Sequence, residues 1–146
     1  QAIAAKLRQQ GVEAAIEEAR SEGVEIDLDI QAIEDIVDGE LVDNTRDITE
    51  TILRDFKPDA ILCGKDWVAV QVYFVLAQHN LSIPADVGVA SFDNWDCIPQ
   101  ILQPNLSSMA LPYFQMGETA VDKLTQQQLE DSIEKLGCRA HLRQSF

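Results

Sequence analysis

The chain has 146 residues, of which 46% are hydrophobic and 25% charged, a balance typical of one folded domain with its own core. Its 25 acidic and 11 basic residues give a formal net charge of −14; this charge repels phosphate backbones, so the chain alone is not expected to bind nucleic acid. It has no apolar run near the roughly 20 residues of a membrane helix and no secretion signal. We therefore expect a cytoplasmic protein without a membrane contact. Because the sequence begins with Gln1 and not with an initiator Met, we also expect it to be part of a longer protein.

The reactive residues are too scattered to indicate a metal or cofactor site. Cys63, Cys97 and Cys138 lie far apart and form no CxxC pair, which is typical of free thiols in a reducing compartment. His79 and His141 have no metal-ligand spacing around them. We expect neither a metal nor a cofactor.

The N-terminal third is predicted to form a helix, a strand and a second helix. Apolar residues recur at helical spacing over 2–21. Strict alternation over 24–30 predicts a half-exposed strand. The second helix is predicted to follow a cap at Asp43 or Asn44 and to reach Phe56.

The remaining elements again alternate between strands and helices. The apolar run at 60–63 is typical of a central parallel strand, and Asp66 is predicted to cap a helix that begins at Trp67. A further strand is predicted over 87–92. The last predicted elements are an extended segment over 106–111, a helix that starts at Pro112 and a strand over 138–142.

This alternation predicts an α/β protein with a three-layer, doubly wound parallel sheet. In such sheets, ligands bind beyond the carboxyl ends of the strands. Two predicted strand ends carry polar or aromatic residues, at 63–66 and at 91–95. A carboxylate such as Asp93 accepts hydrogen bonds from hydroxyl groups, and an aromatic ring covers the apolar face of a sugar. From the pattern alone, Asp93 could equally cap a turn.

Several segments, in order, resemble the sensor domain of lactose/galactose-repressor-type (LacI/GalR-type) transcription regulators. After a helix start at 6–12 (KLRQQGV), they are 59–69 (DAILCGKDWVA), 81–94 (LSIPADVGVASFDN), 104–109 (PNLSSM), 113–121 (YFQMGETAV) and 138–145 (CRAHLRQS). The resemblance covers nearly the whole chain and implies the second half of a two-lobed sensor with the type I periplasmic binding protein-like fold.

The resemblance also implies a division of the chain between the two lobes. Residues 1–103 would form most of the C-terminal lobe, 104–130 would be a crossover strand and helix of the N-terminal lobe, and 131–146 would return to the C-terminal lobe. The DNA-binding domain, a helix-turn-helix or a winged helix, would lie outside this chain. Because the rest of the N-terminal lobe is absent, we expect residues 105–128 to be disordered or docked on a neighbouring copy.

Matched residue by residue, the resemblance implies an effector cleft lined by Arg8, Asp93 and Tyr113. Arg8 would donate to ligand hydroxyls, Asp93 would accept from them, and Tyr113 would supply an aromatic wall. Trp67 and Trp95 are further candidate walls. The alternatives are a surface position for Arg8, core packing for Tyr113, and packing or interface positions for the tryptophans.

Lys65 departs from the family pattern, in which asparagine is usual at this position. Asparagine both donates and accepts hydrogen bonds, whereas lysine only donates and carries a charge. With Arg8 and Lys65 at one cleft, the effector would be anionic, a sugar acid or a sugar phosphate. The alternative is that Lys65 pairs with Asp93.

The predicted helix from Trp67 would, by resemblance, form a homodimer interface, with Val70 and Leu102 as contacts. A homodimer fits the two-fold half-sites that such regulators read. We therefore expect the effector-sensing and dimerisation domain of a bacterial transcriptional regulator.

Two other functions compete with this interpretation. A periplasmic sugar-binding protein of an uptake system would share the architecture. A doubly wound enzyme is the second alternative, but the sequence has no G-x-G-x-x-G, P-loop or G-x-S-x-G motif. We expect no catalytic activity.

Overall fold

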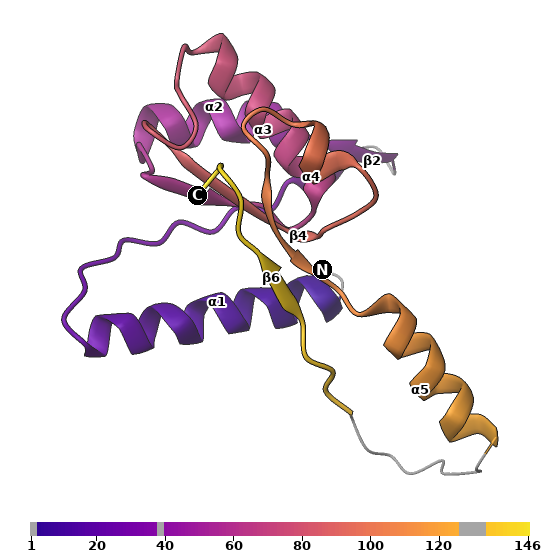
Figure 1. Cartoon of the computed structure of the whole chain (residues 1–146). Coiled ribbons are helices and arrows are strands. Elements are labelled where there is room, and N and C mark those ends of the chain that lie inside the picture. Colours follow the sequence, from indigo (N-terminus) through magenta and orange to yellow (C-terminus); the bar gives the residue numbers. More distant parts are fainter. Residues whose placement is uncertain (1–2, 38–39, 126–133) are drawn as a thin grey trace. The chain divides into compact units, whose positions relative to one another are not determined.

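The computed structural model describes residues 3–37, 40–125 and 134–146. It divides into two compact units, residues 1–58 and 59–146, here called the N-terminal and C-terminal units. Figure 1 shows their helices and strands along the chain. None of the helices in the described ranges is long and apolar enough to cross a membrane.

The N-terminal unit contains two helices and a hairpin. Helices α1 (Ile3–Ser21) and α2 (Thr45–Asp55) confirm the two predicted helices, and β1 (Glu34–Val37) pairs antiparallel with β2 (Glu40–Asp43). Asn44 occupies the N-cap position of α2 without a side-chain cap bond. The Asp43 carboxylate instead accepts hydrogen bonds from the backbone N–H of Thr45, at 2.9 Å, and from its hydroxyl, at 2.6 Å.

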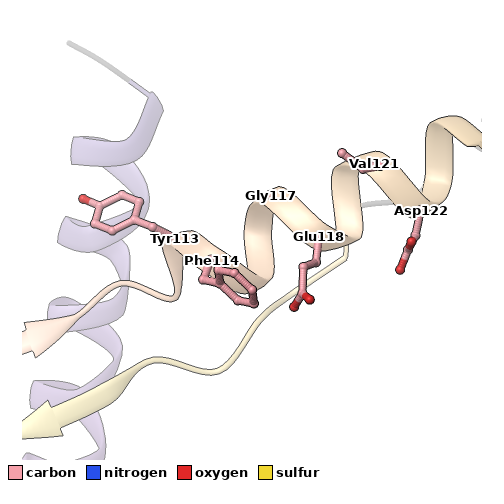
Figure 2. A pocket seen from close by; sticks show the side chains of 6 residues that line it. All are labelled: Tyr113, Phe114, Gly117, Glu118, Val121 and Asp122. Atoms are coloured by element: carbon pink, nitrogen blue, oxygen red, sulfur yellow. The ribbon is translucent and has the colours of Figure 1, made fainter.

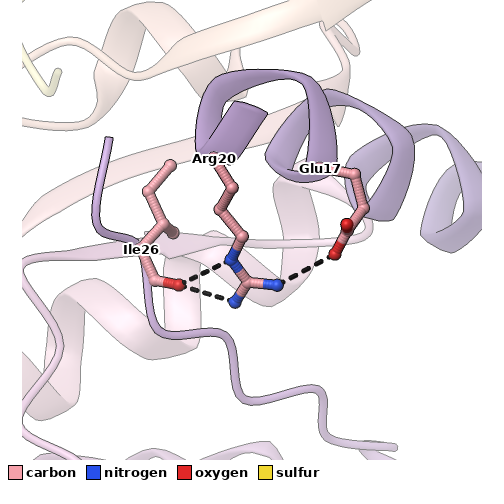
Figure 3. Close-up of polar contacts among 3 residues, drawn as sticks. All are labelled: Glu17, Arg20 and Ile26. Carbon is pink, nitrogen blue, oxygen red and sulfur yellow. Dashed lines mark hydrogen bonds and ion pairs between the residues drawn. The ribbon is translucent and has the colours of Figure 1, made fainter. Parts of the chain in front are cut away.

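The predicted strand over 24–30 is wrong. The segment forms no ladder with any described strand, and Leu28 and Ile30 are exposed. It is held to the end of α1 instead, because Arg20 donates from Nε and Nη2 to the carbonyl of Ile26, at 3.0 and 2.6 Å (Figure 3). The same guanidinium pairs with Glu17 at 3.0 Å. An alternating pattern describes a half-buried strand only where a neighbouring strand is available to pair with it.

The C-terminal unit is built on a four-stranded sheet in the order β3-β4-β5-β6. The first three strands are parallel, as predicted, whereas β6 joins the edge antiparallel to β5. An antiparallel edge strand on a parallel sheet is a common arrangement. The strands are β3 (Ala60–Leu62), β4 (Gly88–Asp93), β5 (Ser107–Ala110) and β6 (Arg139–His141).

The core of this unit lies between α3 (Asp66–Gln78) and the sheet. Helix α3 contacts β4 and the short helix α4 (Ile98–Ile101). Each fully buried aliphatic side chain contributes roughly 1.5–3 kcal/mol, so this contact holds β4 against α3. The buried apolar side chains are Cys63, Val68, Ala69, Val72, Tyr73, Val75, Leu76, Val87, Val89 and Leu106.

The segment predicted to be disordered or docked is partly paired within the chain. Residues 107–110 form β5 inside the sheet, so neither alternative applies to them. Helix α5 (Tyr113–Thr125) follows and has no buried residue, and residues 126–128 lie outside the described ranges. Docking of α5 on a neighbouring copy stays a prediction, as does the division of the chain between two lobes.

Candidate functional site

The candidate site lies at the carboxyl edge of the sheet in the C-terminal unit. Because β3, β4 and β5 are parallel, their carboxyl ends meet at one edge, where α/β sheets bind ligands. Residues predicted to contact ligand follow each of these ends. They are Lys65 and Trp67 after β3, Asp93 and Trp95 at and after the end of β4, and Tyr113 after β5.

Asp93 ends β4 in an unusual backbone conformation. Its φ is 100°, and Asn94, which follows it, has a φ of 47°. A left-handed backbone at a residue with a side chain costs of order 1–3 kcal/mol and persists only where the surroundings impose it. Such conformations cluster at functional sites. Asp93 is half-buried, and its backbone conformation implies that bonds from surrounding residues hold it.

Asp66, which is 1% exposed, bonds the backbone two residues after Asp93. Its Oδ2 accepts the backbone N–H of Trp95 at 2.6 Å. Its Oδ1 accepts the hydroxyls of Ser91 and, at 2.6 Å, Ser108. The prediction that Asp66 caps the helix is wrong: it is the first residue of α3, Lys65 takes the N-cap position, and no side-chain cap bond forms. Three donors inside the protein hold the carboxylate instead.

Residues 93–95, here called the Asp93 loop, are also bonded to β5 and to the C-terminal tail. The Ser108 hydroxyl oxygen accepts the backbone N–H of Asn94 at 3.0 Å. Arg143 donates from Nη2 to the Asn94 side-chain oxygen, at 2.8 Å, and from Nη1 to the Leu106 carbonyl, at 2.7 Å. The Asp93 loop is thus bonded to α3, β5 and the tail.

Ser145 fastens the tail itself. Its hydroxyl is fully buried, donates to the Val89 carbonyl at 2.6 Å and accepts the Ser107 N–H at 2.7 Å. The Val89 N–H donates to the Ser145 carbonyl at 2.7 Å. Ser145 of the final Arg-Gln-Ser therefore bridges the amino-terminal parts of β4 and β5.

Two tryptophans near Asp66 present large aromatic surfaces to solvent. Trp67 is 62% exposed and Trp95 is 65% exposed. Trp67 follows Asp66 in the chain, and the backbone of Trp95 is bonded to the Asp66 carboxylate. Exposed aromatic rings beside a carboxylate suit a ligand with both apolar faces and hydroxyls. Their use as ligand walls or as interface surface stays open.

The remaining predicted site residues are placed separately. Arg8 lies on α1 in the N-terminal unit, so its approach to Asp93 stays a prediction. Lys65 is exposed at the start of α3, and Tyr113 is exposed at the start of α5. Val70 on α3 and Leu102 after α4 are partly exposed. The structure does not test their predicted role in a dimer.

Two other features do not form sites. A hollow of about 450 Å³ is lined by residues of α5 alone, from Tyr113 to Asp122 (Figure 2), and one helix cannot enclose a ligand. Burial, together with the nearby Asp66 carboxylate, raises the pKa of the Cys63 thiol to about 12, which leaves it unreactive. Within the described residues, no group of three or more histidine, cysteine or acidic side chains could hold a metal ion.

Sequence reasoning missed the residues that support the loop. Ser91, Ser108, Asn94, Arg143 and Ser145 had no assigned role. A signal was present for Ser91, because a polar residue on the buried face of an apolar strand needs a hydrogen-bond partner. Its partner, Asp66, lies 25 residues away in the sequence, beyond the range of local patterns.

Comparison with known proteins gives the family. The whole chain, residues 1–146, matches the periplasmic binding protein-like domain family. The chain is 38% identical over 72 residues to the lactose operon repressor of Rhizobium radiobacter, covering 49% of this chain and 63% of the relative. It is 31% identical over 120 residues to the ribose operon repressor of Escherichia coli, covering 82% of this chain and 34% of the relative.

A solved structure shares the fold. The chain aligns with a LacI-family transcriptional regulator from Enterococcus faecium with bound ribose, at 25% identity and a TM-score of 0.59, over 70% of this chain and 39% of the other. The chain thus spans less than two thirds of each of these relatives. With the family match over its full length, the chain belongs to the periplasmic binding protein-like domain family as a sensor domain of the LacI/GalR type.

Proposed function

We propose that this chain is part of the effector-sensing and dimerisation domain of a bacterial DNA-binding transcriptional regulator, and that its effector is a sugar or a sugar derivative. One observation carries the proposal: Asp93 ends a buried parallel strand in a left-handed conformation, at the edge where such sheets bind ligands. The relatives are named as lactose and ribose operon repressors, and one structural neighbour holds ribose.

The residues at this edge suit polyol recognition. The Asp93 carboxylate accepts hydrogen bonds from ligand hydroxyls, and the exposed rings of Trp67 or Trp95 cover an apolar sugar face. Arg8 would add donors from the N-terminal unit. Effector binding changes the affinity for DNA only if the effector binds one arrangement of the sensor lobes more tightly than the other.

The partners follow from the same proposal. DNA would be contacted through a domain outside this chain, because a net charge of −14 opposes contact by the chain itself. The protein would work as a homodimer in the cytoplasm. The names of the relatives favour a regulator over a periplasmic binding protein of an uptake system and over an enzyme.

The test is thermal unfolding of the full-length polypeptide that carries this chain, with neutral sugars, sugar acids and sugar phosphates. A ligand at 100 times its Kd stabilises the native state by about 2.7 kcal/mol, which raises Tm by about 5 °C or more in a domain of this size. We expect at least one compound to do so, and Asp93→Ala to abolish the shift.

The charge of the active compound decides the role of Lys65. If a sugar acid or phosphate stabilises the protein and Lys65→Gln removes the preference, Lys65 binds the anion. If a neutral sugar works equally well with Lys65→Gln, the anionic-effector proposal is wrong. An active compound whose effect survives Asp93→Ala would contradict the site, and a panel without any shift would contradict the sugar class.

A further inference from the structure

The Asp93 loop is held by two consecutive backbone bonds. The N–H of Asn94 donates to the Ser108 hydroxyl oxygen at 3.0 Å, and the N–H of Trp95 donates to Asp66 Oδ2 at 2.6 Å. The Asn94 N–H belongs to the peptide group that follows Asp93. Because a peptide group is planar, fixing this N–H fixes the backbone rotation after Asp93. The next bond fixes the following peptide in the same way.

Both acceptors are themselves linked and buried. The Ser108 hydroxyl accepts from Asn94 and donates to Asp66 Oδ1 at 2.6 Å. Asp66 and Ser108 are 1% and 4% exposed, so water does not compete for these bonds. Because the Ser108 hydroxyl proton points to the Asp66 carboxylate, a lone pair on the Ser108 oxygen faces the Asn94 N–H.

This support counteracts the local preference of the strand. Val89 and Ser91 are buried on one face of β4, and regular alternation would continue that face to Asp93. The left-handed φ of 100° instead ends the strand at Asp93. Without external bonds, a residue with a side chain would relax out of this conformation.

We propose that Ser108, oriented by Asp66, is the positioning residue that holds Asp93 in its ligand-accepting geometry. The assignment rests on the proposed function, in which Asp93 contacts the effector. It places the residue that positions Asp93 on β5, the neighbouring strand, in which Asp93 pairs with Ala110.

The chain offers a matched control for this role. Ser91 and Ser108 are register partners on β4 and β5, both buried, and both donate to Asp66 Oδ1. Within the described structure, the Ser108 hydroxyl bonds the loop and the Ser91 hydroxyl does not. Replacing either serine by alanine therefore removes one donor from the same carboxylate, but only Ser108→Ala frees the Asn94 N–H.

The experiment is hydrogen exchange at single-amide resolution on the full-length polypeptide, comparing Ser108→Ala, Ser91→Ala and Ser108→Thr with the unmodified protein. We expect Ser108→Ala to accelerate exchange at Asn94 at least 10-fold more than Ser91→Ala does. Ser108→Thr keeps the hydroxyl and should restore protection. Equal acceleration by the two alanine variants, or none by Ser108→Ala, would overturn the proposal.

A ligand readout separates this inference from the proposed function. With D-ribose as the probe, Ser108→Ala should weaken binding at least 10-fold, Ser91→Ala less than threefold, and Ser108→Thr should recover most of the affinity. If ribose binds all four proteins equally, positioning by Ser108 is wrong although the sensor function stands. If ribose binds none of them, the exchange result alone decides the positioning role.

Discussion

Asp66 and Asp93 show how two aspartates near one sheet edge take different roles. Asp66 is buried and its carboxylate accepts three hydrogen bonds. Asp93 is half-buried at the end of a strand and has a left-handed backbone conformation. The sequence predicted a site residue at Asp93. It misassigned Asp66 because an aspartate just before an apolar helix is also the usual pattern of an N-cap. Its donors lie 25, 29 and 42 residues away.

Replacing Asp93 by glycine or by alanine separates ligand contact from backbone strain. Alanine keeps the strain of the left-handed φ, which is of order 1–3 kcal/mol. Glycine removes this strain, but its greater freedom in the unfolded chain destabilises the folded state by about 0.5–1 kcal/mol. We expect Asp93→Gly to be more stable than Asp93→Ala by about 1 kcal/mol in urea unfolding. Both should lose the effector response. An alanine variant as stable as the glycine variant would show that the loop relaxes easily.

Cys63 should be the unreactive thiol among the three cysteines. Burial and the Asp66 carboxylate raise its pKa to about 12, so at pH 8 only about one molecule in 10⁴ carries the reactive thiolate. Cys97 and Cys138 are exposed. With iodoacetamide at pH 8, peptide mapping should find label on Cys97 and Cys138 within minutes, and on Cys63 only after urea is added. Because the pKa is raised, an increase from pH 8 to pH 9 should leave Cys63 protected in the native protein. Rapid labelling of Cys63 in the native protein would contradict its burial.

At the scale of elements, local sequence patterns predicted the helices and strands whose packing depends on apolar residues close together in the sequence. The spacing of apolar residues located α1, α2, α3 and α5, and short apolar runs located β3 and β4. The same rule failed at 24–30, where alternation was present but a partner strand was not, and it missed the hairpin of β1 and β2. The direction of β6 also could not be predicted, because an edge strand is accepted in either orientation.

The C-terminal tail is an element whose stability depends on one hydroxyl. Ser145→Ala would leave the Val89 carbonyl and the Ser107 N–H without their partner. An unsatisfied buried group costs roughly 1–3 kcal/mol, so we expect a loss of about 2 kcal/mol or more in urea unfolding. Leu142→Ala, three residues earlier and 79% exposed, is the control and should change stability by about 0.5 kcal/mol at most. Equal effects would mean that the tail is not fastened through Ser145.

At the scale of the molecule, charge limits where two copies can meet. Each copy carries a net charge of −14, so their approach is unfavourable except across a surface with few charges. After Asp66, helix α3 has no charged residue. Trp67, Val70 and Phe74 recur at helical spacing on the side of α3 that is not packed against the core, and Ile101 of the neighbouring α4 is also exposed. This uncharged surface is the best candidate for the proposed homodimer contact.

Phe74→Asp tests that contact. Phe74 is 63% exposed, so the change should leave the fold intact while placing a carboxylate against the partner. A central aromatic contact contributes about 2 kcal/mol or more, so we expect the dimer Kd of the full-length polypeptide to rise about 30-fold or more in sedimentation velocity. Added salt should strengthen the unmodified dimer, because it screens the repulsion between two acidic copies. Leu142→Asp also replaces an exposed apolar side chain by a carboxylate, but outside α3 and α4. If Leu142→Asp dissociates the dimer and Phe74→Asp does not, the copies meet through another surface.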